Sequence, residues 1–432
     1  MGWSYFYGAK FVDVANKYYI CGIYWHNMKI NKAVIKRISR VVLKVVGVAM
    51  SIALLAVVAT SVSPVYNFPD NKPFSGPDIF NPYRDIDTTY CWKRANFHTH
   101  TRVEGIFNEC QKWPQGVYEE YQKYGYDIVT FSNHNELTEH PFDKELQVNL
   151  YEHGYNLLKF HKLVFGSDEV NRFDHLLPLF TFQRQYQLDL LRAESDIVVL
   201  NHPLRTPLTT KGMMEKLSGY DIIELDSGKS TENEYWDWAL SAGHYSFGLA
   251  NDDMHYPDRS NAIAVRCNFL CSPSAKYEDI KATLLGGCYY AMRVPDYGKG
   301  DWEVKVERNR ELPYITNIGV EQQDIYLALS TEATEIKLIG QHHKLLEVWH
   351  NSAEARYTLP SEEPYARFII YFADGEVIYT NPFARYDTAL AESPFREGEH
   401  SVNIALTLLY NFVVLVLVVA IIFATYRYII KR

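Results

Sequence analysis

Histidines and carboxylates in the central part of this sequence stand in a pattern suited to binding divalent metal ions. The stretch "RANFHTHTRVEG" contains His98 and His100, one residue apart. Residues two apart in a strand share a face, so both imidazoles can point to one site. Asp253 and His255 in "ANDDMH" repeat this spacing. Imidazole and carboxylate ligands suit transition-metal ions, and several such ions together suit hydrolysis.

Other histidines and acidic residues follow apolar runs elsewhere in the chain. A single His-x-His pair is weak evidence, because an isolated histidine is more often solvated or structural. Six histidines and at least two carboxylates at the ends of expected strands form a stronger signal. The further candidates beside these runs are His134, Glu169, His175 and His202. We therefore predict a site for several metal ions.

Short apolar runs alternate with amphipathic segments between residues 94 and 295, which predicts repeated strand–helix units and a parallel sheet. The expected strands are 126–134, 163–170, 175–180, 196–203, 221–228, 245–255 and 261–270. The expected helices are 114–125, 185–195, 210–220, 232–243 and 277–291. In such α/β folds the carboxyl ends of the parallel strands carry the site. The number of successive units favours closure into a barrel.

From Trp302 onward the apolar pattern changes to a period of two, which predicts antiparallel strands. These expected strands are 324–329, 335–340, 344–350, 367–372 and 376–380. Asp374-Gly375 between the last two is a hairpin-turn signal. We assign residues 91–298 to a metal-binding domain and 299–400 to a small antiparallel β domain.

Two uncharged apolar runs, 45–62 and 405–426, are long enough to cross a bilayer as helices. Basic residues precede the first run and follow the second: Lys29, Lys32, Lys36, Arg37, Arg40, Lys44, then Arg427, Lys431 and Arg432. By the positive-inside rule, residues 1–44 and 427–432 are cytoplasmic and the central domains lie outside. A cleaved signal peptide is the alternative for the first run, because Ala59 and Ser61 suit a cleavage site.

The segments around the first span carry further signals. Residues 63–90 are rich in Pro, Asn and Asp and indicate a linker. Met28 opens "MKINKAVIKRISR", a basic lead-in typical of export segments, so a start at Met28 and a genuine tail from Met1 both stay open. The net charge of -9 argues against a nucleic-acid partner. The expected partner is the lipid bilayer, and no protein partner is identifiable.

A series of motifs in chain order resembles the PHP family, the polymerase and histidinol phosphatase domains. The motifs are "FHTHTRVEG", "VTFSNHN", "GSDEVNRFDHLL", "VVLNHP", "IIELDSG" and "ANDDMH". They cover about half the chain, and the ordered set is more specific than any single motif. The resemblance implies a distorted (β/α)7 barrel with two or three divalent metal ions, commonly zinc, manganese or iron.

The resemblance also implies a ligand group for each ion. The first ion would be held by His98, His100, Glu169 and Asp253. Glu169 would bridge to a second ion, completed by His175 and His202. The third ion would use Glu104, His134 and His255. The choice between Asp168 and Glu169 as the bridging carboxylate stays open, and Asp252 is expected to face away and to tolerate substitution.

The implied reaction is hydrolysis of a phosphate ester by a metal-bridging hydroxide. Arg205 and Arg102 border the ligands and could bind phosphate oxygens. Glu224 either orients a ligand or leaving group or is only structural. The alternatives are an amide or carboxylic ester hydrolase and a non-catalytic surface binding module. The substrate would be a phosphoester, another small molecule or an envelope polymer.

Overall fold

The computed structural model describes residues 32–86, 92–104, 108–228, 234–396 and 399–430. The chain divides into two compact units: residues 1–59 with 414–432, and residues 60–413. The expectations for Met28 and for the tail from Met1 to Asn27 lie outside the described residues.

The first unit is built from two long apolar helices, α2 (Lys32–Ala59) and the greater part of α9 (Ile404–Ile430). The segments Ala33–Ala59 and Ile404–Ile430 have mean hydropathies of 2.6 and 2.8 and could each span a membrane. The first helix ends at Ala59, short of the expected Val62, and begins within the basic segment. Tyr428 donates a hydrogen bond to the carbonyl of Leu43 at 2.9 Å, which joins the two helices.

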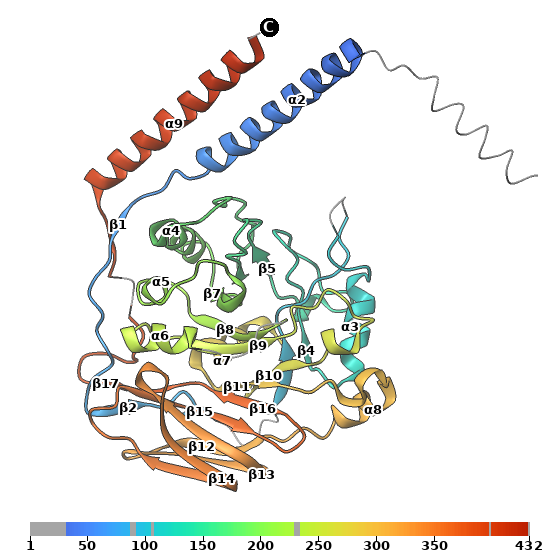
Figure 1. The fold of residues 1–432 in the computed structure, drawn as a ribbon. Helices are drawn as coiled ribbons and strands as arrows, with labels where there is room; N and C mark the ends of the chain where they lie inside the picture. Colours follow the sequence, from blue (N-terminus) through green and yellow to red (C-terminus); the bar gives the residue numbers. More distant parts are fainter. Residues whose placement is uncertain (1–31, 87–91, 105–107, 229–233, 397–398, 431–432) are drawn as a thin grey trace, which may run out of the picture. The chain divides into compact units, whose positions relative to one another are not determined.

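The second unit contains two larger sheets (Figure 1). The five-stranded sheet has the order β5-β6-β7-β8-β9, with β5 (Leu150–His153), β6 (Lys162–Phe165), β7 (Ile197–Leu200), β8 (Ile222–Ser227) and β9 (Phe247–Asn251). Only β7, β8 and β9 are parallel; β5, β6 and β7 run antiparallel. The short run of parallel pairing differs from the expected succession of parallel strands.

The other large sheet has eleven strands and includes the C-terminal segments. Its strands are β2 (Asp78–Phe80), β3 (Lys93–Asn96), β4 (Ile128–Val129), β10 (Arg266–Leu270), β11 (Tyr289–Arg293), β12 (Ile315–Glu321), β13 (Asp324–Gly340), β14 (Lys344–Thr358), β15 (Tyr365–Tyr371), β16 (Val377–Thr380) and β17 (Phe383–Tyr386). A separate two-stranded sheet pairs β1 (Tyr66–Asn67) with β18 (Ser401–Val402).

The expected closed barrel is not formed by the described residues, because the two large sheets are not joined by a continuous ladder. Two isolated parallel bridges link them instead, Thr99 to Met254 and His134 to Glu152. The backbone amide of His100 donates to Met254 at 2.9 Å and that of Asn135 donates to Glu152 at 2.9 Å. Thr99 lies between His98 and His100, and Met254 lies between Asp253 and His255, so the first bridge brings four expected ligands together. The second bridge includes the expected ligand His134 itself.

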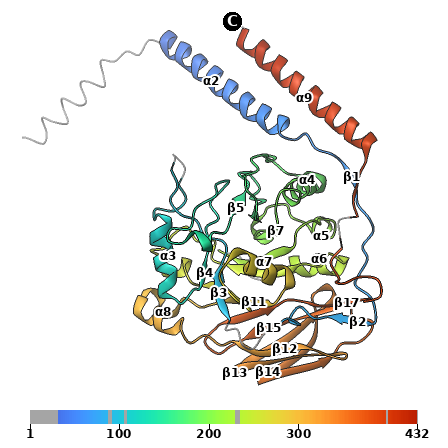
Figure 2. The same ribbon diagram turned by 180° about the vertical axis from the view of Figure 1, so that it is seen from behind.

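The expected metal-binding and β domains share one sheet. Strand β11 (Tyr289–Arg293) pairs with β16 (Val377–Thr380), so the eleven-stranded sheet continues across residue 298. The expected strands 324–329 and 335–340 form the single strand β13, whose pairing with β14 shifts between Ala328 and Ala333. Figure 2 shows β12, β13 and β14 at one end of this unit and α4 and β5 at the other.

The helices of the second unit are α3 (Pro114–Lys123), α4 (Thr181–Arg192), α5 (Lys211–Met214), α6 (Tyr235–Ala242), α7 (Tyr277–Gly286) and α8 (Trp302–Arg308). Helix α7 ends before Gly287, whose φ of 81° suits glycine, and β11 follows where the helix was expected to continue. The expected strand at 175–180 is irregular and leads into α4. Buried side chains of β5 to β9 form one hydrophobic core with part of the eleven-stranded sheet, including Ala95, Leu270 and Tyr289. Other buried side chains of the eleven-stranded sheet form a second core.

Candidate metal centre

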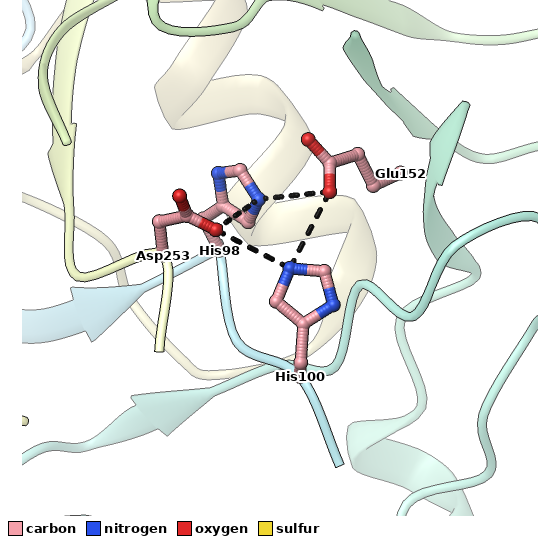
Figure 3. A group of neighbouring side chains, drawn as sticks. All are labelled: His98, His100, Glu152 and Asp253. Atoms are coloured by element: carbon pink, nitrogen blue, oxygen red, sulfur yellow. Dashed lines mark ion pairs between the residues drawn. The ribbon is translucent and has the colours of Figure 1, made fainter. Parts of the chain in front are cut away.

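Four buried side chains, His98, His100, Glu152 and Asp253, converge on one small volume (Figure 3). Their ligand atoms all lie within 4.8 Å of one another. Nε2 of His98 is 3.2 Å from both a Glu152 oxygen and an Asp253 oxygen. Nε2 of His100 is 3.3 Å from the same two oxygens. The two carboxylates thus lie between the two imidazoles.

The hydrogen bonding of His98 determines which of its nitrogens is available to bind a metal ion. Its Nδ1 lies 2.9 Å from Glu224, whose carboxylate accepts the Nδ1 proton. Nε2 is then the nitrogen that faces the Glu152 and Asp253 oxygens. Among the described residues, the buried Nε2 atoms of His98 and His100 have no well-directed hydrogen bond. Two imidazole nitrogens and two carboxylate oxygens that face one another at this spacing fit a divalent cation, which would take the place of the imidazole protons.

Glu152 connects this group to more imidazoles. One Glu152 oxygen lies 3.1 Å from His134, and the other lies 3.0 Å from His161 and 3.4 Å from His202. His134, Glu152 and His161 form a second group with ligand spacing. With His98 and His100, five imidazoles surround one carboxylate. Glu152 therefore has the position of a bridging ligand.

A third group with ligand spacing consists of His100, Glu109 and His134. A Glu109 oxygen lies 3.4 Å from His100 and 3.3 Å from His134. The Glu109 side chain is 45% exposed, whereas His100 is buried. The three groups share His100, His134 and Glu152, so they form one continuous cluster that opens to solvent at Glu109.

Charge within the cluster shifts the pKa of several groups. Burial acts to raise the pKa of Glu152, but His134, His98 and His161 hold that pKa well below its usual range. Burial acts to lower the pKa of His100, but Asp253 and Glu152 raise it to about 9. Burial lowers the pKa of His134 to about 4. The Glu152 carboxylate therefore stays ionised and can bind cations near neutral pH.

The two isolated bridges explain how distant segments meet here. His98 and His100 flank Thr99, whose bridge partner Met254 follows Asp253 directly. His134 and Glu152 are themselves bridge partners. Asp253 has a φ of 50° and His202 a φ of 25°, values uncommon for residues with a side chain. Such strained backbone is often found at functional sites.

The structure brings most of the expected site residues together. His98, His100, His134, His202 and Asp253 lie in the cluster, as the distances above show. Nε2 of His255 lies 3.2 Å from Asp253, and its ring stacks on that of His100 with centroids 4.2 Å apart.

Two of the expected catalytic residues contact these ligands. Glu224 accepts from His98, and its second oxygen accepts from the backbone amide of His202 at 3.2 Å. Arg205 forms an ion pair with Asp253 and keeps 27% of its side chain exposed.

Four expected residues lie elsewhere and require correction. Glu104 and Glu169 are exposed and belong to none of the three groups, and the alternative Asp168 is exposed as well. His175 donates from Nδ1 to the carbonyl of Thr60 at 2.5 Å. Arg102 is exposed, with its guanidinium over the ring of Trp113. Glu152 occupies the central position expected for Glu169, and Glu109 takes the place expected for Glu104.

Three cluster residues were missed by the sequence reasoning: Glu109, Glu152 and His161. Glu152 lies in the short strand β5, "LYEH", where an acidic residue between apolar and aromatic neighbours is the available signal. His161 directly precedes β6 (Lys162–Phe165) and has no second histidine or carboxylate two residues away. Glu109 lies in a polar loop, where neither a strand end nor a ligand spacing marks it in the sequence.

No protein-family model and no curated protein matches this chain. A solved two-domain protein from Bacteroides vulgatus, containing a predicted PHP-like metal-dependent phosphoesterase, is 16% identical. That comparison covers 73% of this chain and 100% of the other, with a TM-score of 0.37. The lesion-specific endonuclease EndoQ from Pyrococcus furiosus is 12% identical over 45% of this chain and 56% of its own, with a TM-score of 0.31.

Proposed function

We propose that this protein is a membrane-anchored, metal-dependent hydrolase of the PHP type that cleaves phosphate esters. The observation that carries the proposal is Glu152, a buried carboxylate with five imidazoles within 3.4 Å of its oxygens. Three groups of side chains have possible ligand atoms close enough to hold a metal ion, and these groups share His100, His134 and Glu152. That arrangement suits two or three ions of zinc, manganese or iron rather than one structural ion.

Bound divalent ions would supply Lewis acidity, acidifying a water molecule and neutralising the oxygens of the group under attack. The chain's own residues have distinct parts. His98, His100, Glu152 and Asp253 would hold one ion, and His134, Glu152 and His161 a second. Nε2 of His134 faces both Glu152 and Glu109 and can bind one ion only, so Glu109 with His134 would be the alternative to that second group. Glu224 accepts the Nδ1 proton of His98, which keeps Nε2 free as a ligand atom.

Arg205 favours a phosphate ester over an amide or a carboxylic ester. Its guanidinium contacts Asp253 at the edge of the cluster and is partly exposed. A guanidinium can bind two phosphate oxygens at once, whereas an uncharged carbonyl group gains less from it. A non-catalytic binding module has no need for a buried, charged cluster of this kind.

We also propose that the catalytic unit lies outside the cytoplasm. Support comes from the two apolar helices and from Lys36, Arg37, Arg40 and Lys44 in the first part of α2. A reporter fused after Arg432 should be active only in a form that functions in the cytoplasm. Activity of an extracytoplasmic reporter at that position would refute the topology.

The test of the hydrolase uses the full chain with Glu152→Gln and a matched control, Glu169→Gln. The Glu152 variant should lose at least about one bound ion per chain and about a hundredfold in hydrolysis of a chromogenic phosphate ester. The exposed Glu169 variant should retain both. Equal metal content in the two variants, measured by elemental analysis, would disprove the central role of Glu152.

A further inference from the structure

The loops beside the metal centre expose a group of large apolar side chains. These are Leu157, Phe173, Leu179, Phe180, Leu204 and Leu208, here called the apolar loop face. Leu157 is 68% exposed and Leu208 is 59% exposed. Side chains of this size scattered singly on a surface need no explanation, but several on adjoining loops indicate a contact surface.

Hydrogen bonds hold the three loops of this face together. The backbone amide of Leu157 donates to Leu176 at 2.9 Å. The buried guanidinium of Arg184 donates to the carbonyl of Pro178 at 3.1 Å and to that of Pro207 at 3.0 Å. The apolar loop face is therefore carried by loops fixed to one another.

The same loops contact the segment that follows α2 and the first turns of α9. His175 donates to the carbonyl of Thr60, the residue that directly follows Ala59 at the end of α2. Gln183 donates to the Tyr410 hydroxyl at 3.1 Å, and Tyr410 lies in α9. Ser63 and Asn411 also hydrogen-bond to each other, which ties the two segments together. The residues that form these hydrogen bonds all belong to the second unit.

The loops also reach the metal centre. The hydroxyl of Tyr155 donates to the carbonyl of His134 at 3.0 Å, and Leu204 directly precedes Arg205. The surface beside the cluster is thus continuous with Thr60, which follows one candidate membrane span, and with Tyr410, which lies in the first turns of the other. A surface in that position, with several exposed leucine and phenylalanine side chains, matches the interfacial region of a bilayer.

We infer that the apolar loop face contacts the lipid bilayer and that the substrate is a phosphate ester carried by a membrane lipid. The inference rests on the proposed function, since it names the substrate class of the same site. A lipid headgroup in the bilayer would reach the metal centre beside Arg205 without leaving the membrane. The apolar loop face would hold the opening of the site at the bilayer surface.

The contact with lipid is tested without any activity measurement. Leu157→Cys and Leu208→Cys are made one at a time in the full chain, labelled with a fluorophore and reconstituted in phosphatidylcholine vesicles. Leu345→Cys is the control, because Leu345 is 50% exposed but lies in β14 at the opposite end of the unit (Figure 1). Brominated lipids should quench the labels at 157 and 208 and leave the label at 345 unquenched. Equal quenching at all three positions, or none at 157 and 208, would overturn the inference.

The substrate class is tested with two phosphate esters. Full-length protein loaded with manganese or zinc is given phosphatidic acid in vesicles and, separately, water-soluble nitrophenyl phosphate. The double variant Leu157→Ser, Leu208→Ser should lose at least about tenfold in cleavage of the vesicle lipid and keep its rate on the soluble ester. Leu345→Ser should change neither rate.

The outcomes separate the two proposals. Cleavage of nitrophenyl phosphate without cleavage of phosphatidic acid would overturn the lipid substrate and leave the hydrolase standing. Quenching by lipid at 157 and 208 without hydrolysis of either ester would support the bilayer contact and count against the proposed function.

Discussion

Asp252 and Asp253 are consecutive residues whose carboxylates lie in different environments. Asp253 contacts His98 and His100 at 3.2 Å and 3.3 Å. Asp252 accepts hydrogen bonds from the backbone amides of Ala264, Val265 and Arg266 at 2.7, 3.0 and 2.8 Å. It therefore faces away from the cluster, as expected, but it holds a loop in place.

Asp253→Asn should lower hydrolysis by about a hundredfold with little loss of stability, because it removes a metal ligand. Asp252→Asn should instead lower the free energy of unfolding by about 1–3 kcal/mol, since an amide NH2 group would face backbone donors. Activity assays and thermal unfolding of the two full-length variants separate these effects. A larger loss of bound metal at Asp252 would contradict the assignment.

Glu224→Gln should weaken metal binding by about 10-fold to 100-fold, because Gln accepts the His98 proton less strongly. Glu224 is a positioning residue, buried between His98 and the backbone of His202. Excess metal should restore most of the rate, a rescue that a folding defect would not show. A rate that stays low at saturating metal would exclude the positioning role.

Arg205→Gln should raise KM for a chromogenic phosphate ester by about 10-fold to 100-fold, the effect of losing a charge-assisted hydrogen bond. Hydrolysis of a carboxylic ester, if present, should change less. Arg102→Gln is the matched control, since Arg102 lies over Trp113 instead of in the cluster. Identical KM values in all three proteins would remove Arg205 from substrate binding.

The buried pair Asp237 and Arg367 joins α6 to β15 and should contribute strongly to stability. Arg367 donates to Asp237 at 2.6 Å, and both side chains are fully buried. Asp237→Asn leaves the guanidinium without its charge partner, which should cost about 3–5 kcal/mol. Asp374→Asn, in the exposed pair with Arg308, should cost about 0–1 kcal/mol. Unfolding midpoints of the two variants measure both losses of stability. Similar losses in Asp237→Asn and Asp374→Asn would contradict the stronger contribution of the buried pair.

The same pair predicts a pH dependence. Burial acts to raise the pKa of Asp237, but Arg367 and His343 hold it below its ordinary value of 3.8. The unfolded chain then takes up the proton first as pH falls. The stabilisation is fully present above pH 3.8 and is lost as pH falls toward the lower pKa of the folded state. Asp237→Asn should flatten the acid side of the stability curve, and an unchanged slope would refute this.

The sequence by itself determined the features that depend on local pattern. Hydropathy over a continuous run identified both apolar helices, and strand spacing placed His98, His100 and Asp253 in one site. These signals are local because each lies within one element or at its end.

Tertiary structure alone decided the central carboxylate. Strand β6 ends at Phe165, and Gly166, with a φ of 75°, turns the chain so that Asp168 and Glu169 reach solvent. Glu152 reaches the cluster because its strand forms a bridge with His134, eighteen residues earlier in the chain. A ligand supplied by pairing between separate segments has no periodicity in the sequence, since its position depends on how those segments pack.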